Sequence, residues 1–283
     1  MSRLKKQSWS VAKGRVIGPS QFFIVGIVNV TPDSFYDGGR CFDTDKAVAQ
    51  ALDQLKQGAE IIDIGGESTR PFSRRIEAAE EMERIRPIIR QVLEAHPQAF
   101  ISIDTYKAEV AEEVLRAGCS IINDVSACRF DPGLKEVLGA FQPGYVLMHS
   151  LGRPEEMQKN PRYTDVVDEI RSFFETRMTD LVKAGLPEEN IVLDPGIGFG
   201  KLLEHNLTIL KHIERFFDLG RPIYMGLSNK SMWEKLLGLP SGARKTATQV
   251  ATALLASRGV ALHRVHEVDL TQQTLEIVKN ISL

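Results

Sequence analysis

The stretch FFIVGIVNVTPDSFYDGG, residues 22–39, places an apolar run directly before a long polar loop. Residues 22–28 are rich in β-branched side chains without strict alternation, which is typical of a strand buried on both faces. The run stops at Asn29, and the residues from there to Gly39 include Thr, Pro, Ser, two Asp and two Gly. This abrupt change predicts a buried strand that opens into a functional loop.

Seven more runs of this kind follow, and helical patterns separate them. The strand-like runs are residues 60–64, 100–103, 120–122, 144–148, 191–193, 222–225 and 261–265. The helical patterns are residues 45–56, 77–95, 107–117, 164–184, 203–217, 246–258 and 269–278, with a short helix opening at Asp131 and Pro132. This alternation, with no linker, predicts one α/β domain over residues 1–283, a (β/α)8 TIM barrel. We expect residues 1–20 to form a β-hairpin over the barrel bottom; a doubly wound open sheet is the alternative fold.

Composition places the chain among ordinary globular proteins. Of its 283 residues, 43% are hydrophobic and 25% are charged, with a formal net charge of −2. This balance gives no electrostatic reason to expect binding to nucleic acid or to an anionic membrane. Cys41, Cys119 and Cys128 are odd in number and lack metal-ligand spacing, which predicts a reduced, cytoplasmic protein. The apolar run after the basic N-terminus breaks at Asn29, so neither a signal peptide nor a transmembrane segment is expected.

Polar or charged residues follow each strand-like run. They are Asn29, the stretch GGESTRP, Asp104, Asn123, His149, Asp194, Lys230, His266 and Glu267, with Arg264 inside the last run. The carboxyl ends of all strands meet at one mouth of a parallel barrel, so the set is predicted to form one site. Asp124 or Thr105 taken alone is more simply explained as a helix N-cap. Arg, Lys and His are poor caps, which favours a functional site for the set as a whole.

The residue types suggest a flat heterocycle with a charged tail. Carboxylates at Asp104 and Asp194 suit the paired N–H groups of an amidine-like edge, as in a 2-aminopyrimidinone. Asn123 adds an amide, and the Lys230 ammonium is able to donate to a ring carbonyl. A second group suits a phosphate or diphosphate, with a hard cation on an amide oxygen. Its members are Asn29, Arg70, Arg264 and His266.

The glycine-rich stretch GIGFG, residues 196–200, has a different explanation from a dinucleotide loop. Its spacing departs from G-x-G-x-x-G, and a lone glycine cluster is weak support for a nucleotide site. We expect its glycines to let the backbone pass close to a flat ligand, with Phe199 available to stack on it. No HExxH, CxxC or GxSxG pattern occurs in the chain.

Together these motifs resemble the dihydropteroate synthase family. The matching stretches are GIVNVTPDSFYDGG, DIGGESTRP, SIDTYKAEV, INDVS, VLMHS, LDPGIGFGK, GLSNKS and RVHEV, which run from about residue 22 to residue 268. The resemblance implies a transferase of folate biosynthesis and a sulfonamide target. In its reaction para-aminobenzoate displaces pyrophosphate from 6-hydroxymethyl-7,8-dihydropterin pyrophosphate to give 7,8-dihydropteroate, by a route thought to be SN1-like.

The resemblance also assigns a role to individual residues. The pterin would be held by Asp104, Asn123, Asp194, Lys230, Met148 and Phe199, and the aminobenzoate bordered by Thr69, Arg70, Pro71 and Ser231. The diphosphate would lie at Asn29, Arg264 and His266, with Mg²⁺ on Asn29. Arg264, His266 and Lys230 would be the catalytic residues. The loop at residues 31–39 would close over the substrates, and the chain would form a homodimer.

Two positions depart from the family pattern and keep other functions in consideration. Asn229 stands where the family usually has Arg, and Phe72 follows Pro71 where the family usually has Gly. A catalytically weak pterin-binding paralogue is therefore one alternative. The other is a methyltetrahydrofolate-dependent methyltransferase, which shares the barrel and the Asp/Asn/Asp group but is not expected to carry NVTPDSF and STRP.

Overall fold

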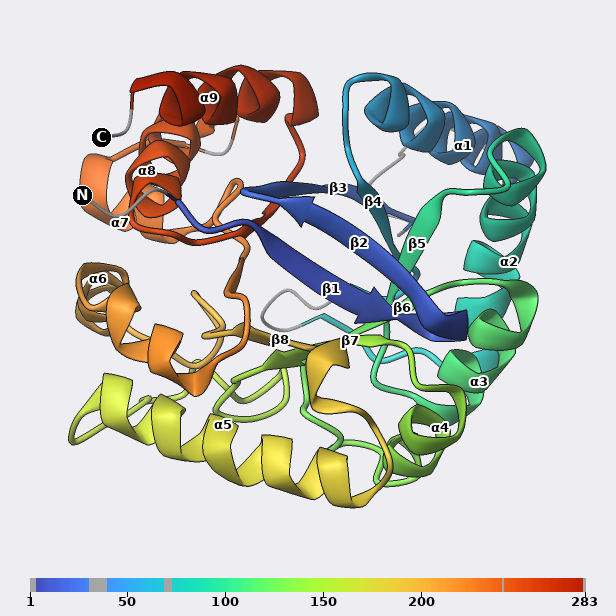
Figure 1. Ribbon diagram of the computed structural model, residues 1–283, viewed down its shortest axis with the longest axis horizontal. Helices are drawn as coiled ribbons and strands as arrows, with labels where there is room; N and C mark the ends of the chain where they lie inside the picture. Colours follow the sequence, from blue (N-terminus) through green and yellow to red (C-terminus); the bar gives the residue numbers. More distant parts are fainter. Residues whose placement is uncertain (1–3, 31–39, 69–72, 241, 282–283) are drawn as a thin grey trace.

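Parallel strands form a ring at the centre of the computed structural model, which describes residues 4–30, 40–68, 73–240 and 242–281 (Figure 1). The order around this 8-stranded sheet is β8-β7-β6-β5-β4-β3-β10-β9. A parallel bridge between Leu193 and Ile223 joins the two ends of the sheet. The strands are β3 Phe23–Asn29, β4 Ile61–Gly65, β5 Phe100–Asp104, β6 Ile121–Asp124, β7 Gly144–Met148, β8 Ile191–Asp194, β9 Tyr224–Met225 and β10 Leu262–Val265. The predicted barrel is therefore confirmed, and the open sheet is excluded.

Helices surround the ring and cover its outer face (Figure 1). They are α1 Arg40–Lys56, α2 Ala78–Ala95, α3 Ala108–Ala117, α4 Leu134–Phe141, α5 Val166–Lys183, α6 Leu203–Lys211, α7 Met232–Leu237, α8 Lys245–Ser257 and α9 Val268–Ile281. The single helix predicted for residues 203–217 is wrong, because His212 leaves helical geometry and a 3-10 helix, η4 Ile213–Leu219, follows. Helix α7 was not predicted, because its 6 residues are too few to show a helical period.

The predicted N-terminal hairpin is present and closes the bottom of the barrel. Strands β1 Gln7–Val11 and β2 Arg15–Ser20 pair antiparallel. Trp9 Nε1 donates to the carbonyl of Asn190, just before β8, at 2.7 Å. At Gly144, the first residue of β7, a Cβ atom would come within 2.7 Å of Val11 Cγ1, so glycine is what allows the hairpin to pack there.

The two-residue period of each strand decides which side chains enter the barrel. In β4, Ile61 belongs to the core inside the barrel, whereas Ile62 and Ile64 pack outward against the helices. The same period directs the Asp63 carboxylate into the barrel. The inner core fills the lower barrel with Trp9, Val11, Ile17, Phe23, Val25, Ile61, Ile121, Val146, Val192, Tyr224, Ala261 and Leu262. Polar inward positions therefore gather above this apolar floor, at the carboxyl ends of the strands.

Within the described residues, no helix is both long enough and apolar enough to span a bilayer.

Candidate active site

The strand register brings the predicted pterin-binding residues to one mouth. Asn29 pairs with Gly65, Gly65 with Asp104, and Asp104 with Asn123, which makes one row across four adjacent strands. Asp194 pairs with Met148 at the end of the next two strands. The parallel ring thus converts sequence positions far apart into neighbours.

Asp63, which was not among the predicted site residues, links several of these residues. Its carboxylate is fully buried. It accepts hydrogen bonds from Ser102 Oγ at 2.5 Å, Asn123 Nδ2 at 3.1 Å and Arg264 Nε at 2.7 Å. Because a carboxylate only accepts, it turns the Asn123 amide nitrogen toward itself and the Asn123 oxygen away. A charged residue within the apolar run EIIDI is the feature of the sequence that could have revealed it.

One carboxylate oxygen of Asp104 has no donor in the described part of the chain. Arg264 Nη2 donates to Asp104 Oδ2 at 3.0 Å, whereas Asp104 Oδ1 is buried without a hydrogen-bond partner among the described residues. Burial raises the pKa of Asp104 to about 7, the Arg264 guanidinium opposes this, and the neighbouring Asp63 carboxylate adds to it. A buried acceptor without a donor costs free energy, and a ligand N–H group would satisfy it.

Asp194 and Lys230 supply a second charged pair at the mouth. Asp194 Oδ1 accepts from the backbone N–H of Gly196 at 2.7 Å. Burial raises the pKa of Asp194, and this N–H and the Lys230 ammonium both oppose that rise. Lys230 Nζ lies 4.3 Å from the centroid of the Phe199 ring, a cation–π contact, and burial lowers its pKa to about 8.

An apolar wall completes this part of the mouth. Met148 forms a small buried cluster with Tyr106 and Val125, and Phe130 and Phe199 pack against it. The Tyr106 and Phe130 rings meet edge to face with centroids 5.4 Å apart. Met148 and Phe199 were predicted, whereas Tyr106, Val125 and Phe130 were not, although the first two lie within two residues of a predicted polar strand end.

Chemically, this arrangement suits a flat heterocycle with an edge of N–H donors. Carboxylate oxygens of Asp104 and Asp194 would accept from that edge, and Lys230 would donate to a carbonyl of the ring. The aromatic and methionine side chains provide a surface against which a flat ring can stack.

The residues predicted for the diphosphate and aminobenzoate are only partly described. His266 Nδ1 lies 2.9 Å from Ser228 Oγ, and Arg264 is directed toward Asp63 and Asp104. Ser231 is exposed at the start of α7. Thr69, Arg70 and Pro71, the Phe72 position and the loop at residues 31–39 lie outside the described residues.

Other polar residues near the strand ends hold the backbone. Asp124, on the outward face of β6, accepts from the backbone N–H groups of Ser126 and Cys128, both at 2.6 Å, and from Tyr145 Oη at 2.8 Å. Asp124 therefore holds the turn after β6 and is not the helix N-cap that was considered for it, because α4 begins only at Leu134. Asn229 has φ 56°, a left-handed conformation that Asn adopts more readily than Arg, and its carbonyl accepts from Arg244 Nη1 at 3.1 Å.

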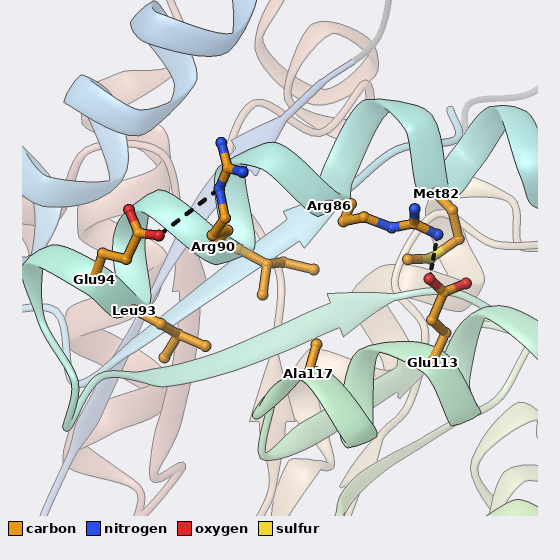
Figure 2. A pocket seen from close by; sticks show the side chains of 8 residues that line it. Met82, Arg86, Arg90, Leu93, Glu94, Glu113 and Ala117 are labelled. Carbon is orange, nitrogen blue, oxygen red and sulfur yellow. Dashed lines mark hydrogen bonds and ion pairs between the residues drawn. The ribbon is translucent and has the colours of Figure 1, made fainter.

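A groove lies between α2 and α3 and is lined by side chains of these two helices (Figure 2). Its apolar strip is flanked by two ion pairs, Arg86 with Glu113 and Arg90 with Glu94. The side chains of these pairs are exposed, so each contributes little free energy. No predicted site residue lines this groove, which is the seam where two neighbouring helices pack.

Comparison with known proteins agrees with this geometry. Residues 25–266 match the family model described as pterin binding enzyme. A dihydropteroate synthase of Neisseria meningitidis serogroup C is 41% identical over 265 residues, which cover 92% of this chain and 93% of that protein.

Solved structures extend the agreement to the fold. A Yersinia pestis dihydropteroate synthase in complex with a sulfonamide drug matches with a TM-score of 0.90 and 36% identity, covering 97% of this chain and 98% of that one. The Xanthomonas albilineans dihydropteroate synthase with 4-aminobenzoic acid matches with a TM-score of 0.89 and 36% identity, covering 96% of this chain and 98% of that one. The chain therefore belongs to the dihydropteroate synthase family of pterin-binding enzymes.

Proposed function

We propose that this protein is a dihydropteroate synthase, a transferase of folate biosynthesis. It joins 6-hydroxymethyl-7,8-dihydropterin pyrophosphate to para-aminobenzoate and releases pyrophosphate. The observation that carries this conclusion is the convergence of Asp104, Asn123 and Asp194, from three different strand ends, with Lys230 of the loop after β9 beside one apolar wall. Such a set of acceptors, one amine and a stacking surface matches the 2-aminopyrimidinone edge and flat rings of a pterin.

For the pterin, we assign the acceptors to its N–H edge. Asp194 and the unpartnered oxygen of Asp104 would accept from ring N–H and amino groups, and the Asn123 oxygen would face the ring. Lys230 would donate to the ring carbonyl, and Met148 and Phe199 would contact the ring faces. The structure supports these roles by placing the groups together at one mouth.

For the diphosphate, we assign Asn29, Arg264 and His266. Arg264 donates from Nε to Asp63 and from Nη2 to Asp104. Its Nη1 carries two further N–H groups that could donate to an anion. Thr69, Arg70, Pro71 and Ser231 would border the aminobenzoate, and residues 31–39 would close over both substrates.

The donor set also bears on the expected Mg²⁺. Among the described residues no three His, Cys, Asp or Glu side chains form a metal cluster, and Asn29 offers a single neutral amide oxygen. Mg²⁺ often binds through few protein ligands together with substrate phosphates, so Asn29 would hold the ion with the diphosphate of the substrate. When bound, the ion would neutralise negative charge on the leaving group.

The chemistry that follows needs no protein nucleophile. The bond between the exocyclic CH₂ carbon and the diphosphate oxygen breaks, and the electron pair leaves with the diphosphate. The aminobenzoate nitrogen forms a bond to that carbon and then loses one proton. Arg264 and His266 would stabilise the departing anion, and Lys230 and the carboxylates would hold the ring in place while positive charge develops on it.

We also propose a homodimer in the cytoplasm. Val250 and Leu254 on α8 are 56% and 59% exposed, and Ile277 and Ile281 on α9 are 58% and 72% exposed. In each helix the two side chains are four residues apart and share one face, and exposed apolar faces of this kind are typical of protein interfaces. Cys119 and Cys128 are buried free thiols, which suits a reducing compartment.

Pyrophosphate release tests the proposed function. Purified protein is mixed with dihydropterin pyrophosphate, para-aminobenzoate and Mg²⁺, and release is followed with and without a sulfonamide. We expect release that needs all components, is inhibited by the sulfonamide and is lost in Asp194→Ala. Pterin binding without release would identify the weak paralogue instead. Methyl transfer from methyltetrahydrofolate would identify the methyltransferase, which the dihydropteroate synthase relatives argue against.

A further inference from the structure

Lys201 is a buried lysine behind the glycine loop, residues 196–200, which follows Asp194 and carries Phe199. Only 2% of it is exposed. Its Nζ lies within hydrogen-bond distance of four acceptors that share its three N–H groups: the carbonyls of Gly196 at 2.9 Å, Phe199 at 3.1 Å and His149 at 3.3 Å, and His149 Nδ1 at 3.0 Å. These contacts join the loop after β8 to the end of β7.

The chemistry of this contact defines the state of His149. The charged form of Lys201 has donors and no acceptor, so in contact with it His149 Nδ1 accepts and the neutral imidazole carries its proton on Nε2. Burial lowers the pKa of His149, and Lys201 and Arg129 lower it further. The His149 ring also packs edge to face on Phe173, with centroids 4.9 Å apart. His149 is thus a fixed acceptor for Lys201, not a residue of the mouth.

The backbone of the loop is shaped to face Lys201. Gly196 and Gly198 have φ values of 68° and 84°, in the left-handed region. A Cβ at Gly196 would lie 1.9 Å from the His149 carbonyl oxygen, so this loop lies directly against the end of β7. On the front of the same loop, the Gly196 N–H donates to Asp194 and the Phe199 ring faces Lys230. The loop therefore has a Lys201 side and a ligand side.

We propose that Lys201 is a positioning residue, which sets Asp194 and Phe199 for the pterin by tying the glycine loop to His149. This inference rests on the proposed function for the identity of the ligand. Without the ammonium, the carbonyls of Gly196 and Phe199 lose a buried donor, and the loop loses its connection to β7. Tyr163 Oη still donates to the Gly200 carbonyl and Asn206 Oδ1 still accepts from the Gly198 N–H, both at 2.8 Å, so the loop stays attached but less ordered.

Lys201 also acts on Asp194 through its charge. The charged groups that face Asp194 are Lys230, Lys201 and Arg264, and all three favour its ionised form. Burial lowers the pKa of Lys201 to about 7, so its charge helps Asp194 below that pH and fades above it. A neutral residue at this position should therefore weaken pterin binding more at pH 6 than at pH 8.5.

The test compares Lys201→Met with Lys201→Gln, which keeps an NH₂ group as donor, and with the exposed-lysine control Lys211→Met. Affinity for dihydropterin pyrophosphate is measured by calorimetry at both pH values, and folding is checked by circular dichroism. We expect a loss of about tenfold or more for Lys201→Met, a smaller loss for Lys201→Gln and none for Lys211→Met. Wild-type affinity in Lys201→Met at both pH values would overturn the proposal, and an equal loss at both would overturn the effect of the Lys201 charge on Asp194.

Hydrogen exchange of the loop separates this inference from the proposed function. Amides of residues 196–200 should exchange faster in Lys201→Met than in wild type, and no faster in Lys211→Met, without any substrate present. Unchanged exchange would overturn the positioning role even in an active enzyme. If Lys201→Met does not fold, Lys201→Gln carries both measurements. Wild-type protein that releases no pyrophosphate would instead overturn the proposed function and leave the exchange test intact.

Discussion

Replacement of Asp63 tests how one buried carboxylate organises the mouth. Its three donors are Ser102 Oγ, Asn123 Nδ2 and Arg264 Nε, at 2.5, 3.1 and 2.7 Å. Asp63→Ala removes the acceptor of all three. In Asp63→Asn, an oxygen in place of Oδ2 still accepts from Asn123 and Arg264, and the new NH₂ group can donate to Ser102 Oγ. The pair of variants therefore separates loss of the hydrogen bonds from loss of the charge.

The expected magnitudes differ between the two variants. Removing one partner of a buried ion pair costs about 3–5 kcal/mol, so Asp63→Ala should lower the free energy of unfolding by that amount. Asp63→Asn replaces charge-assisted bonds with neutral ones of about half the strength, which gives a loss of about 1–2 kcal/mol. Arg264 keeps Asp104 as a counter-charge in both. At about 2–4 °C per kcal/mol, the Ala variant should melt about 6–20 °C below wild type.

Urea unfolding followed by circular dichroism measures both losses, and calorimetry with the pterin substrate measures the effect on the mouth. Asp53→Asn, at an exposed carboxylate on α1, is the control and should stay within about 0.5 kcal/mol of wild type. Pterin affinity should fall in the order wild type, Asn variant, Ala variant, because Asn123 and Arg264 lose their fixed orientation. An Asp63→Ala variant as stable as the control, or one with unchanged pterin affinity, would refute the organising role of Asp63.

Four further changes give direct tests. Asp194→Ala should abolish pterin binding by calorimetry, because Lys230 loses its counter-charge and the amino edge its acceptor; unchanged affinity contradicts this. Pterin affinity should fall as the pH rises through about 8, where the Lys230 ammonium loses its proton, and Lys230→Met should remove this step from the binding profile. Leu254→Glu should turn the proposed dimer into a monomer in analytical ultracentrifugation, and a dimer that survives would exclude the α8 face. Phe72→Gly should change the sulfonamide inhibition constant by relieving crowding beside the expected aminobenzoate site, and equal constants would remove that idea.

The strand pattern was readable from sequence because a parallel barrel buries its strands on both faces. Runs such as residues 144–148 are apolar throughout, and they coincide with observed strands such as β7. Polar strand ends were equally visible, since Asp104, Asn123 and Asp194 each end or nearly end an apolar run. The motifs around them then identified the family. Shorter elements escaped: α7 shows no helical period in 6 residues, and residues 203–217 divide at His212.

Sequence alone therefore determined the barrel, the family and the candidate residues of the mouth. Only the tertiary structure decided which polar side chains enter that mouth. The Asn123 side chain points into it, whereas the neighbouring Asp124 faces outward and accepts a hydrogen bond from the backbone N–H of Ser126. It also disclosed Asp63 and Lys201, whose importance comes from what they contact. A one-dimensional pattern records burial and periodicity, but hydrogen-bond partners such as Asp63 and Arg264, 201 residues apart, are chosen by ring closure and strand register.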